Sequence, residues 1–409
     1  MTDQVQQAMP LWESHRTVGD FIEDLGETIP WLHDYRTTPQ DSEWHAEGDV
    51  HIHVDWVLSE LRGLFEGEAA DLSEDDKTVL TLAALLHDVA KPVTTREVEI
   101  AGKTRIAAPA HESIGASHLF YKAAPFDISP EQWRQVIALT AAHHLPKRLV
   151  VRDRPPRDYH AVARRASPEL LYWLERADMQ GRECADKAEQ IEILELFRAE
   201  CENNGIWHDE PYQDFRREVE TRLADHPPLT RKRIYWQGIR AYESGDIVML
   251  EESFARFYRF IDNQAHLVIL CGPSGCGKTS FVEALDGYAI VSPDRIREDE
   301  FSGRLRKSDQ GTVFHQAREA LRESLRKPES VVWDATNLRR DQRQRLTGLG
   351  LDYEAFVSLA VIQKPAPLLF EHNRARGERA VPEEVLVRQL RRFQLPDIDE
   401  AHELLVVAG

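Results

Sequence analysis

The residues with the most specific chemistry form a glycine-rich loop that follows an apolar run. The loop, GPSGCGKT at 272–279, comes directly after HLVILC, which has the length and composition of a buried strand. Its glycines let backbone N–H groups converge on phosphate oxygens, while Lys278 reaches the terminal phosphates and Thr279 can hold Mg²⁺. The loop therefore predicts binding of ATP or another nucleoside triphosphate with Mg²⁺. The predicted nucleotide-binding residues are Gly272, Ser274, Gly275, Cys276, Gly277, Lys278, Thr279, Ser280 and, from a later motif, Arg376.

Two motifs further along the chain supply groups suited to phosphoryl transfer. SPDRIR at 292–297 places a carboxylate, Asp294, and a guanidinium, Arg297, after the next β-rich run. The carboxylate can take a hydroxyl proton, and the guanidinium can bind a phosphate. NRARGERAVP at 373–382 is typical of a lid that brings an arginine onto the phosphoryl group in transfer. The predicted catalytic residues of this half are Lys278, Asp294, Arg297 and Arg376.

A second set of candidates consists of His and Asp residues in the first half of the chain. They are adjacent His87 and Asp88 in LAALLHDVAKP, His53 in EGDVHIH, His111 in APAHESIGA and Asp178 in ERADMQGR. Imidazole and carboxylate together suit a divalent transition metal, and Mn²⁺, Ni²⁺, Co²⁺, Fe²⁺ and Zn²⁺ all accept such ligands. A carboxylate can bridge two ions, and a bound water that loses a proton becomes a nucleophile. The set therefore predicts hydrolytic chemistry at one or two metal ions.

Four other histidines are treated differently from this set. His143 and His144 are adjacent in TAAHHLP, and neighbouring side chains on a helix point about 100° apart, so only one is expected to face the same metal. We expect His144 to be the ligand. His45 and His51 are interpreted as surface histidines and are left out of the predicted metal site.

The elements that must position these histidines are helices. Apolar residues recur at spacings of three and four, and no alternating strand pattern separates the periodic stretches. Residues 1–186 are therefore predicted to form an all-α domain, and 187–264 a helical bridging segment. The clearest predicted helices are 49–64, 74–91, 129–144 and 168–178.

From His266 onward the pattern changes to short β-rich runs that alternate with helical stretches. HLVILC, YAIVS, VVWDAT and FVSLAVIQ are the β-rich runs. Such alternation predicts an α/β domain with a parallel sheet, over residues 265–409. Ligands of these sheets bind beyond the carboxyl ends of the strands, where the loop, SPDRIR and DATN at 334–337 all fall. The predicted fold is thus multi-domain, with an all-α part, bridging helices and an α/β part.

Composition and charge limit the classes of function. The chain has 409 residues, no run near the roughly 20 apolar residues that cross a membrane, and four cysteines without paired spacing, which together predict a cytoplasmic protein. The net charge is −19, which argues against nonspecific binding to duplex DNA. The acidity is uneven, because residues 266–409 carry 21 Lys+Arg against 22 Asp+Glu.

The motifs of the second half closely resemble the phage-type 5′-OH polynucleotide kinases. The resemblance rests on GPSGCGKT, SPDRIR, DATNLRRDQRQRL and RARGERAVP in that order. It implies that Lys278 and Thr279 serve the phosphates and Mg²⁺, and that Asp294 is the general base for a polynucleotide 5′-OH. It further implies that Arg297 binds the adjacent phosphate and that Arg376 is the lid arginine on the ATP phosphates.

The histidine half resembles the HD phosphohydrolase superfamily, in particular the HD domain attached to bacterial CCA-adding enzymes, over residues 40–185. This resemblance implies a core metal quartet of His53, His87, Asp88 and Asp178. His111 and His144 would complete a second metal site. Lys91 would contact the substrate phosphate.

The joined halves are similar to the bacterial HD-Pnk end-healing enzymes. That resemblance implies an ATP-dependent kinase for 5′-OH ends of RNA or DNA, and a phosphoesterase for 2′,3′-cyclic phosphate and 2′- or 3′-phosphate ends. Since no ligase motif is visible, a separate ligase is expected as a partner. Two alternatives stay open: a small-molecule or nucleotide kinase fused to a nucleotide phosphohydrolase, and a nucleotide-gated RNA sensor without turnover.

Overall fold

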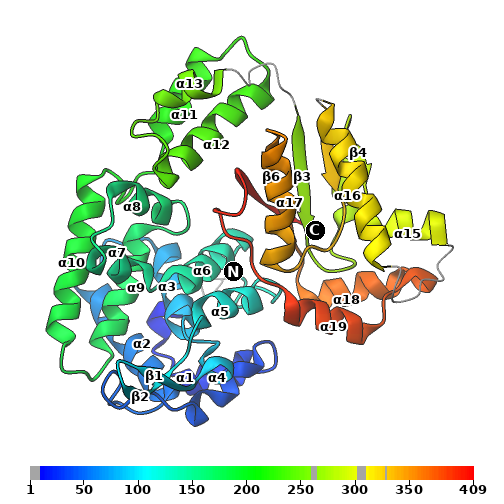
Figure 1. The fold of residues 1–409 in the computed structure, drawn as a ribbon. Coiled ribbons are helices and arrows are strands. Elements are labelled where there is room, and N and C mark those ends of the chain that lie inside the picture. The colour runs from blue at the N-terminus through cyan, green and yellow to red at the C-terminus, as the bar shows by residue number, and fades with distance from the viewer. Residues whose placement is uncertain (1–9, 259–264, 302–309, 328) are drawn as a thin grey trace, which may run out of the picture. The chain divides into compact units, whose positions relative to one another are not determined.

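A computed structural model describes residues 10–258, 265–301, 310–327 and 329–409 (Figure 1). The chain divides into two compact units, Met1–Pro211 and Tyr212–Gly409. The segment predicted to bridge, 187–264, is shared between them. Helix α10 (Lys187–Asn203) packs on α9 and α7 of the first unit, whereas the helices after Tyr212 belong to the second.

The first unit is helical, as predicted. Helix α3 is its centre, since nearly every residue from Val79 to Leu86 is buried and α2, α6 and α9 all pack against it. Helices α3 and α6 begin at serines, Ser73 and Ser129, whose hydroxyls accept a backbone N–H of the first turn. The helices are α1 (Val18–Leu25), α2 (Val50–Glu66), α3 (Glu74–Leu86), α4 (Lys91–Thr94), α5 (His111–Leu119), α6 (Pro130–Ala142), α7 (Leu145–Val151), α8 (Pro156–Ala163) and α9 (Pro168–Gln180).

This unit also contains a β-hairpin that the sequence analysis did not predict. Strands β1 (Arg96–Ile100) and β2 (Lys103–Ala107) pair in antiparallel fashion. They are joined by Ala101 and Gly102, which both have positive φ, as a two-residue hairpin turn requires. The strands escaped prediction because each is only five residues long and neither contains a buried residue.

The second unit contains the predicted parallel sheet. Five strands lie in the order β4-β5-β3-β6-β7, and every pair is parallel. The four predicted β-rich runs are confirmed, and β7 is an additional edge strand. The strands are β3 (His266–Cys271), β4 (Ala289–Val291), β5 (Val331–Trp333), β6 (Phe356–Gln363) and β7 (Glu403–Ala408). The helices between them are α14 (Lys278–Glu283), α15 (Pro293–Phe301), α16 (Gln310–Arg326), α17 (Arg340–Asp352), α18 (Ala366–Ala375) and α19 (Glu383–Arg392).

Helices α11 (Gln213–Arg222), α12 (Pro228–Ser244) and α13 (Glu252–Phe257) form a small apolar core of their own. They are also tied to the α/β part of the same unit. Lys232 pairs with Glu403 at 2.8 Å, and the Arg240 guanidinium donates to the Asp399 and Ala401 carbonyls at 3.0 and 3.1 Å. These contacts make the helical segment part of the second unit.

Candidate active sites

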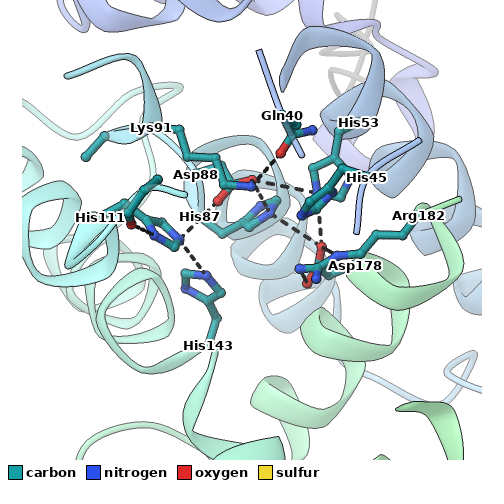
Figure 2. Close-up of polar contacts among 12 residues, drawn as sticks. Gln40, His45, His53, His87, Asp88, Lys91, His111, His143, Asp178 and Arg182 are labelled. Atoms are coloured by element: carbon teal, nitrogen blue, oxygen red, sulfur yellow. Dashed lines mark hydrogen bonds and ion pairs between the residues drawn. The ribbon is translucent and has the colours of Figure 1, made fainter. Parts of the chain in front are cut away.

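Three helices of the first unit bring the predicted core quartet together (Figure 2). His53 lies on α2, His87 and Asp88 follow α3 directly, and Asp178 lies on α9. His53 Nε2 lies 3.0 Å from Asp178 Oδ1 and 3.7 Å from Asp88 Oδ2. His87 Nε2 lies 3.2 Å from Asp88 Oδ2 and 3.8 Å from Asp178 Oδ1. All four side chains are buried, so the helical core holds two imidazoles and two carboxylates around one point.

Asp88 also contacts the histidines predicted for a second site. His111 Nε2 lies 3.2 Å from Asp88 Oδ1, on the opposite carboxylate oxygen from His53 and His87. His143 Nε2 lies 3.3 Å from His111 Nε2, and Figure 2 shows His111 joined both to Asp88 and to His143. Asp88 thus lies between two groups of imidazoles, which is the arrangement of a bridging carboxylate.

The adjacent residues His143 and His144 have different neighbours. His143 is buried against His111 and His87, whereas the Nδ1 of His144 lies 2.9 Å from the Glu112 carboxylate. Both rings can join His111 in a group of possible ligands, and His144 can also join Asp178. The geometry at His111 thus favours His143, the residue that the sequence prediction had passed over.

Backbone carbonyls and a carboxylate fix how the imidazoles face the cluster. The Nδ1 atoms of His87, His111 and His143 lie 2.8, 2.8 and 2.9 Å from the carbonyls three residues earlier, so each carries its proton there. The Nε2 lone pairs are then directed inward. His53 uses the Glu47 carboxylate in the same way, with Nδ1 2.9 Å from Oε1. Such outer contacts orient metal-binding histidines and raise their basicity.

Charged neighbours hold both carboxylates in their ionised form. Burial by itself would raise the pKa of Asp88, but His87 and the Lys91 ammonium, 2.7 Å away, lower that pKa well below its ordinary value. Burial opposes ionisation of Asp178 too, and its ion pair with Arg182 lowers its pKa well below the usual range. The cluster therefore offers two anionic oxygen ligands at neutral pH.

The donor set fits a divalent transition metal. His53 Nε2, His87 Nε2 and Asp88 Oδ2 are buried and make close charged contacts, but none of these contacts has the geometry of a hydrogen bond within the described part of the chain. Unsatisfied buried polar atoms are costly, and a cation bound among them would satisfy all three. One ligand atom each from His53, His87 and Asp178 lie within 4.8 Å of one another. Burial keeps the pKa of His143 well below its ordinary value, so this ring is neutral, as a metal ligand must be.

The surface interpretation of His45 was wrong. His45 is buried, its Nδ1 lies 2.8 Å from Glu47 Oε1, and its ring packs edge-on against His53 at 4.8 Å. Glu47 joins His45 and His53 in a further group of possible ligands. Neither residue has helical or strand periodicity, because both lie in the loop before α2, so the sequence pattern carried no signal for them.

A pocket of about 300 Å³ opens beside the cluster. Its wall includes His111 and His144 together with Lys91 and Arg182, so cationic side chains and candidate metal ligands face the same space. Lys91 donates to the Gln40 side chain at 2.6 Å, which fixes its ammonium near Asp88. A phosphate that enters this pocket meets two positive charges next to the metal-binding atoms.

In the second unit, the glycine-rich loop has the backbone that its sequence predicts. Gly275 and Gly277 have φ values of 82° and 109°, which L-residues rarely adopt. The Gly272 N–H donates to the Thr336 carbonyl at 2.9 Å, which joins the loop to the DATN segment. Lys278 donates to the Gly272 and Pro273 carbonyls at 2.9 and 2.7 Å, so its ammonium lies across its own loop.

Asp294 and Arg297 lie on α15 and form an ion pair with each other. Burial raises the pKa of Asp334. The positive charge of Lys278 lowers this pKa, and the negative charge of Asp294 raises it, so both groups act on Asp334 electrostatically. Strands β3, β4 and β5 are parallel, and Lys278, Asp294 and Asp334 each follow the carboxyl end of one of them, so all three lie at one edge of the sheet. The sequence analysis assigned no role to Asp334.

The predicted lid segment packs against the loop through its helices. Gly275 lies close to Leu369 and Asn373 of α18. A Cβ atom added at Gly275 would be in ordinary van der Waals contact with both residues. The Asn373 side chain is bonded twice to Val381, which closes the turn that carries Arg376. Arg376 itself is exposed. From α19, Gln389 accepts the Ser274 N–H at 2.8 Å, a contact that no motif predicted.

Comparisons with known proteins define the class of each part. A family model of the HD domain matches residues 50–178, which include the whole predicted metal quartet. A model of the AAA domain matches residues 267–396, which include the phosphate loop, Asp294 and Arg376. The chain therefore combines an HD domain with a P-loop α/β domain, a buried His/Asp cluster and a nucleotide-binding loop.

Part of the chain also matches a solved kinase structure. A solved gluconokinase from Sinorhizobium meliloti 1021 matches with 22% identity and a TM-score of 0.27, over 35% of this chain and 82% of that chain. The comparison with curated proteins gave no significant match. Among the described residues, no helix has both the length and the apolar character needed to cross a membrane.

Proposed function

We propose that this chain is a bifunctional enzyme that heals the ends of broken RNA or DNA strands. The P-loop domain transfers the γ-phosphate of ATP to a 5′-OH end. The HD domain opens 2′,3′-cyclic phosphates and removes 2′- or 3′-phosphates. The observation that carries the proposal is the pairing of two sites in one chain. A buried His/Asp cluster lies beside a pocket that Lys91 and Arg182 help to line, and a phosphate loop shares its sheet edge with an exposed carboxylate.

In the HD domain, the chain's own residues bind and orient the phosphoester. His53, His87, Asp88 and Asp178 would hold a divalent metal, with His111 and either His143 or His144 available for a second. When bound, the metal supplies a hydroxide nucleophile and neutralises phosphate charge. Lys91 and Arg182, both in contact with the cluster carboxylates, attract the phosphate into the pocket.

In the P-loop domain, Lys278 leaves its backbone carbonyls to contact the β- and γ-phosphates. Thr279 of the same loop would hold Mg²⁺. Asp294 takes the proton of the attacking 5′-OH, while Arg297 is near enough to bind the adjoining phosphate. Arg376 approaches the transferred group from the lid. Asp334 is a further candidate for the Mg²⁺ shell because it lies near Lys278.

The two activities suit one substrate. Transesterifying cleavage of RNA leaves a 2′,3′-cyclic phosphate on one fragment and a 5′-OH on the other. Neither end can be joined until the first is dephosphorylated and the second phosphorylated. A separate ligase then seals the healed ends.

The test uses an oligoribonucleotide with a 5′-OH and a 2′,3′-cyclic phosphate, incubated with ATP and Mg²⁺ or Mn²⁺. Mass spectrometry of the products is expected to show one phosphate gained at the 5′ end and the cyclic phosphate lost at the other. Phosphorylation of a free sugar or nucleoside in preference to the oligonucleotide would instead support a small-molecule kinase. Tight oligonucleotide binding without turnover would support a sensor.

A further inference from the structure

Trp44 forms part of the wall of the pocket beside the His/Asp cluster, and it is 40% exposed. Large exposed aromatic side chains that border a pocket are characteristic of ligand-binding surfaces. The neighbouring residue, His45, is buried in the cluster itself. The indole therefore stands one residue away from the cluster, on the solvent side of the same loop.

The loop that carries Trp44 is held in place by hydrogen bonds at both of its ends and at its tip. Pro39 and Asp49 form a bridge that closes the loop, and the Gln40 N–H donates to the Gly48 carbonyl at 3.2 Å. The Asp41 carboxylate accepts the N–H groups of Glu43 and Trp44 at 3.0 and 3.3 Å. The indole is thus positioned before any ligand arrives.

The unexpected hairpin supports the same side chain. Ile106 of β2 donates its N–H to Asp41 at 3.2 Å, and Arg105 donates to the same carboxylate at 3.0 Å. The Arg105 guanidinium lies over the Trp44 ring, 5.0 Å from its centroid. A cation over one face of the ring fixes its plane while much of the residue stays exposed.

We propose that Trp44 is a stacking platform for the nucleobase next to the phosphate that the HD domain hydrolyses. Lys91 and Arg182 bind a negative charge deep in the pocket, and Trp44 offers an aromatic surface at its mouth. A phosphorylated nucleoside carries this combination of anion and flat ring. Stacking accepts every base, because every base has a π-face, so the platform requires a base without choosing among bases.

This inference rests on the proposed phosphoesterase activity and gives it a substrate requirement. The test compares the four nucleoside 2′,3′-cyclic phosphates with 1-O-methylribose 2′,3′-cyclic phosphate, which has no base. For the wild type, kcat/KM is expected to be about tenfold higher with any base than without one. In Trp44→Leu this ratio falls toward one, mainly through KM, and Trp44→Phe retains most of it.

Trp56 provides the matched control, since it is 43% exposed and lies outside the pocket. Trp56→Leu is expected to keep the wild-type ratio. A wild-type ratio near one, or an unchanged ratio in Trp44→Leu, would overturn the platform while the phosphoesterase stands. If the wild type hydrolyses neither these esters nor the 2′,3′-cyclic phosphate end of the oligoribonucleotide with any of the divalent metals, the proposed phosphoesterase fails, and the platform falls with it. Hydrolysis of the oligoribonucleotide end alone would overturn the platform as tested on nucleosides and leave the phosphoesterase standing.

Discussion

The two candidate sites differ most in how strongly their key carboxylates are buried and contacted by other side chains. The Asp88 side chain is 1% exposed and lies in contact with histidines and a lysine, whereas the Asp294 side chain is 70% exposed and pairs only with Arg297 among the described residues. Thr279 and Arg376 are exposed as well. A metal site must bring several ligands to one point before the ion binds, while a kinase site is completed by the charges of its substrates.

The largest difference between the two sites is expected when the Asp88 carboxylate, which contacts both groups of histidines, is removed. Asp88→Asn is expected to lower phosphoesterase activity about a thousandfold, because Asp88 faces both groups of histidines and carries the charge that the metal requires. Metal content by mass spectrometry and hydrolysis of a 2′,3′-cyclic phosphate end are the measurements. Kinase activity should be unchanged. His87→Ala is the companion variant, and full phosphoesterase activity in either would contradict the metal site.

The reciprocal experiment acts on the kinase edge. Asp294→Asn is expected to lower the rate of 5′-phosphorylation about a hundredfold or more, since the amide cannot accept the hydroxyl proton. Lys278→Ala should also abolish phosphorylation, through loss of phosphate contacts. Phosphoesterase activity serves as the control in both variants. Equal loss of both activities would show that the two sites are not independent.

Replacing each member of the adjacent pair sharpens the description of the metal site. His143→Ala is expected to lose about tenfold more metal affinity or activity than His144→Ala, because His143 Nε2 faces His111 while His144 pairs with Glu112. The readout is metal titration followed by phosphoesterase kinetics. The reverse ranking would restore His144, the residue predicted from sequence.

A smaller effect is expected from acid in the second unit. Burial lowers the pKa of His402 to about 3, while the unfolded ring titrates near 6.5. The unfolded chain therefore binds a proton below about pH 6.5 that the folded chain does not, and stability falls by about 1.4 kcal/mol per pH unit for this group as the pH drops from there.

The Val357 N–H donates to His402 Nδ1 at 2.9 Å. In His402→Asn the amide oxygen can accept this hydrogen bond, and the titratable imidazole is gone. Urea midpoints of the wild type and the variant, measured between about pH 7 and pH 5, are expected to converge as the pH falls. Parallel pH profiles would show that His402 titrates normally in the fold.

The sequence by itself determined that a helical part precedes an α/β part with a parallel sheet, and it marked the candidate residues of both sites. GPSGCGKT and the adjacent His87 and Asp88 are local signals, because a tight phosphate loop and a helix-end ligand pair need particular residue types at fixed spacing. Strands β3 and β6 were predicted from their largely apolar runs, in which every residue except Gln363 is buried. Local signals of this kind survive without knowledge of the tertiary fold.

Only the tertiary structure decided which further residues lie beside the motif residues in each site. His45, Glu47 and Arg182 reach the cluster from a loop and a helix end, where no periodicity marks an inward direction. The hairpin β1–β2 carries Arg105 to Trp44 across sixty residues of chain. Gln389 meets Ser274 from a distant helix in the same way. Such contacts depend on how elements pack rather than on sequence spacing, so the pocket and its lining follow from the fold alone.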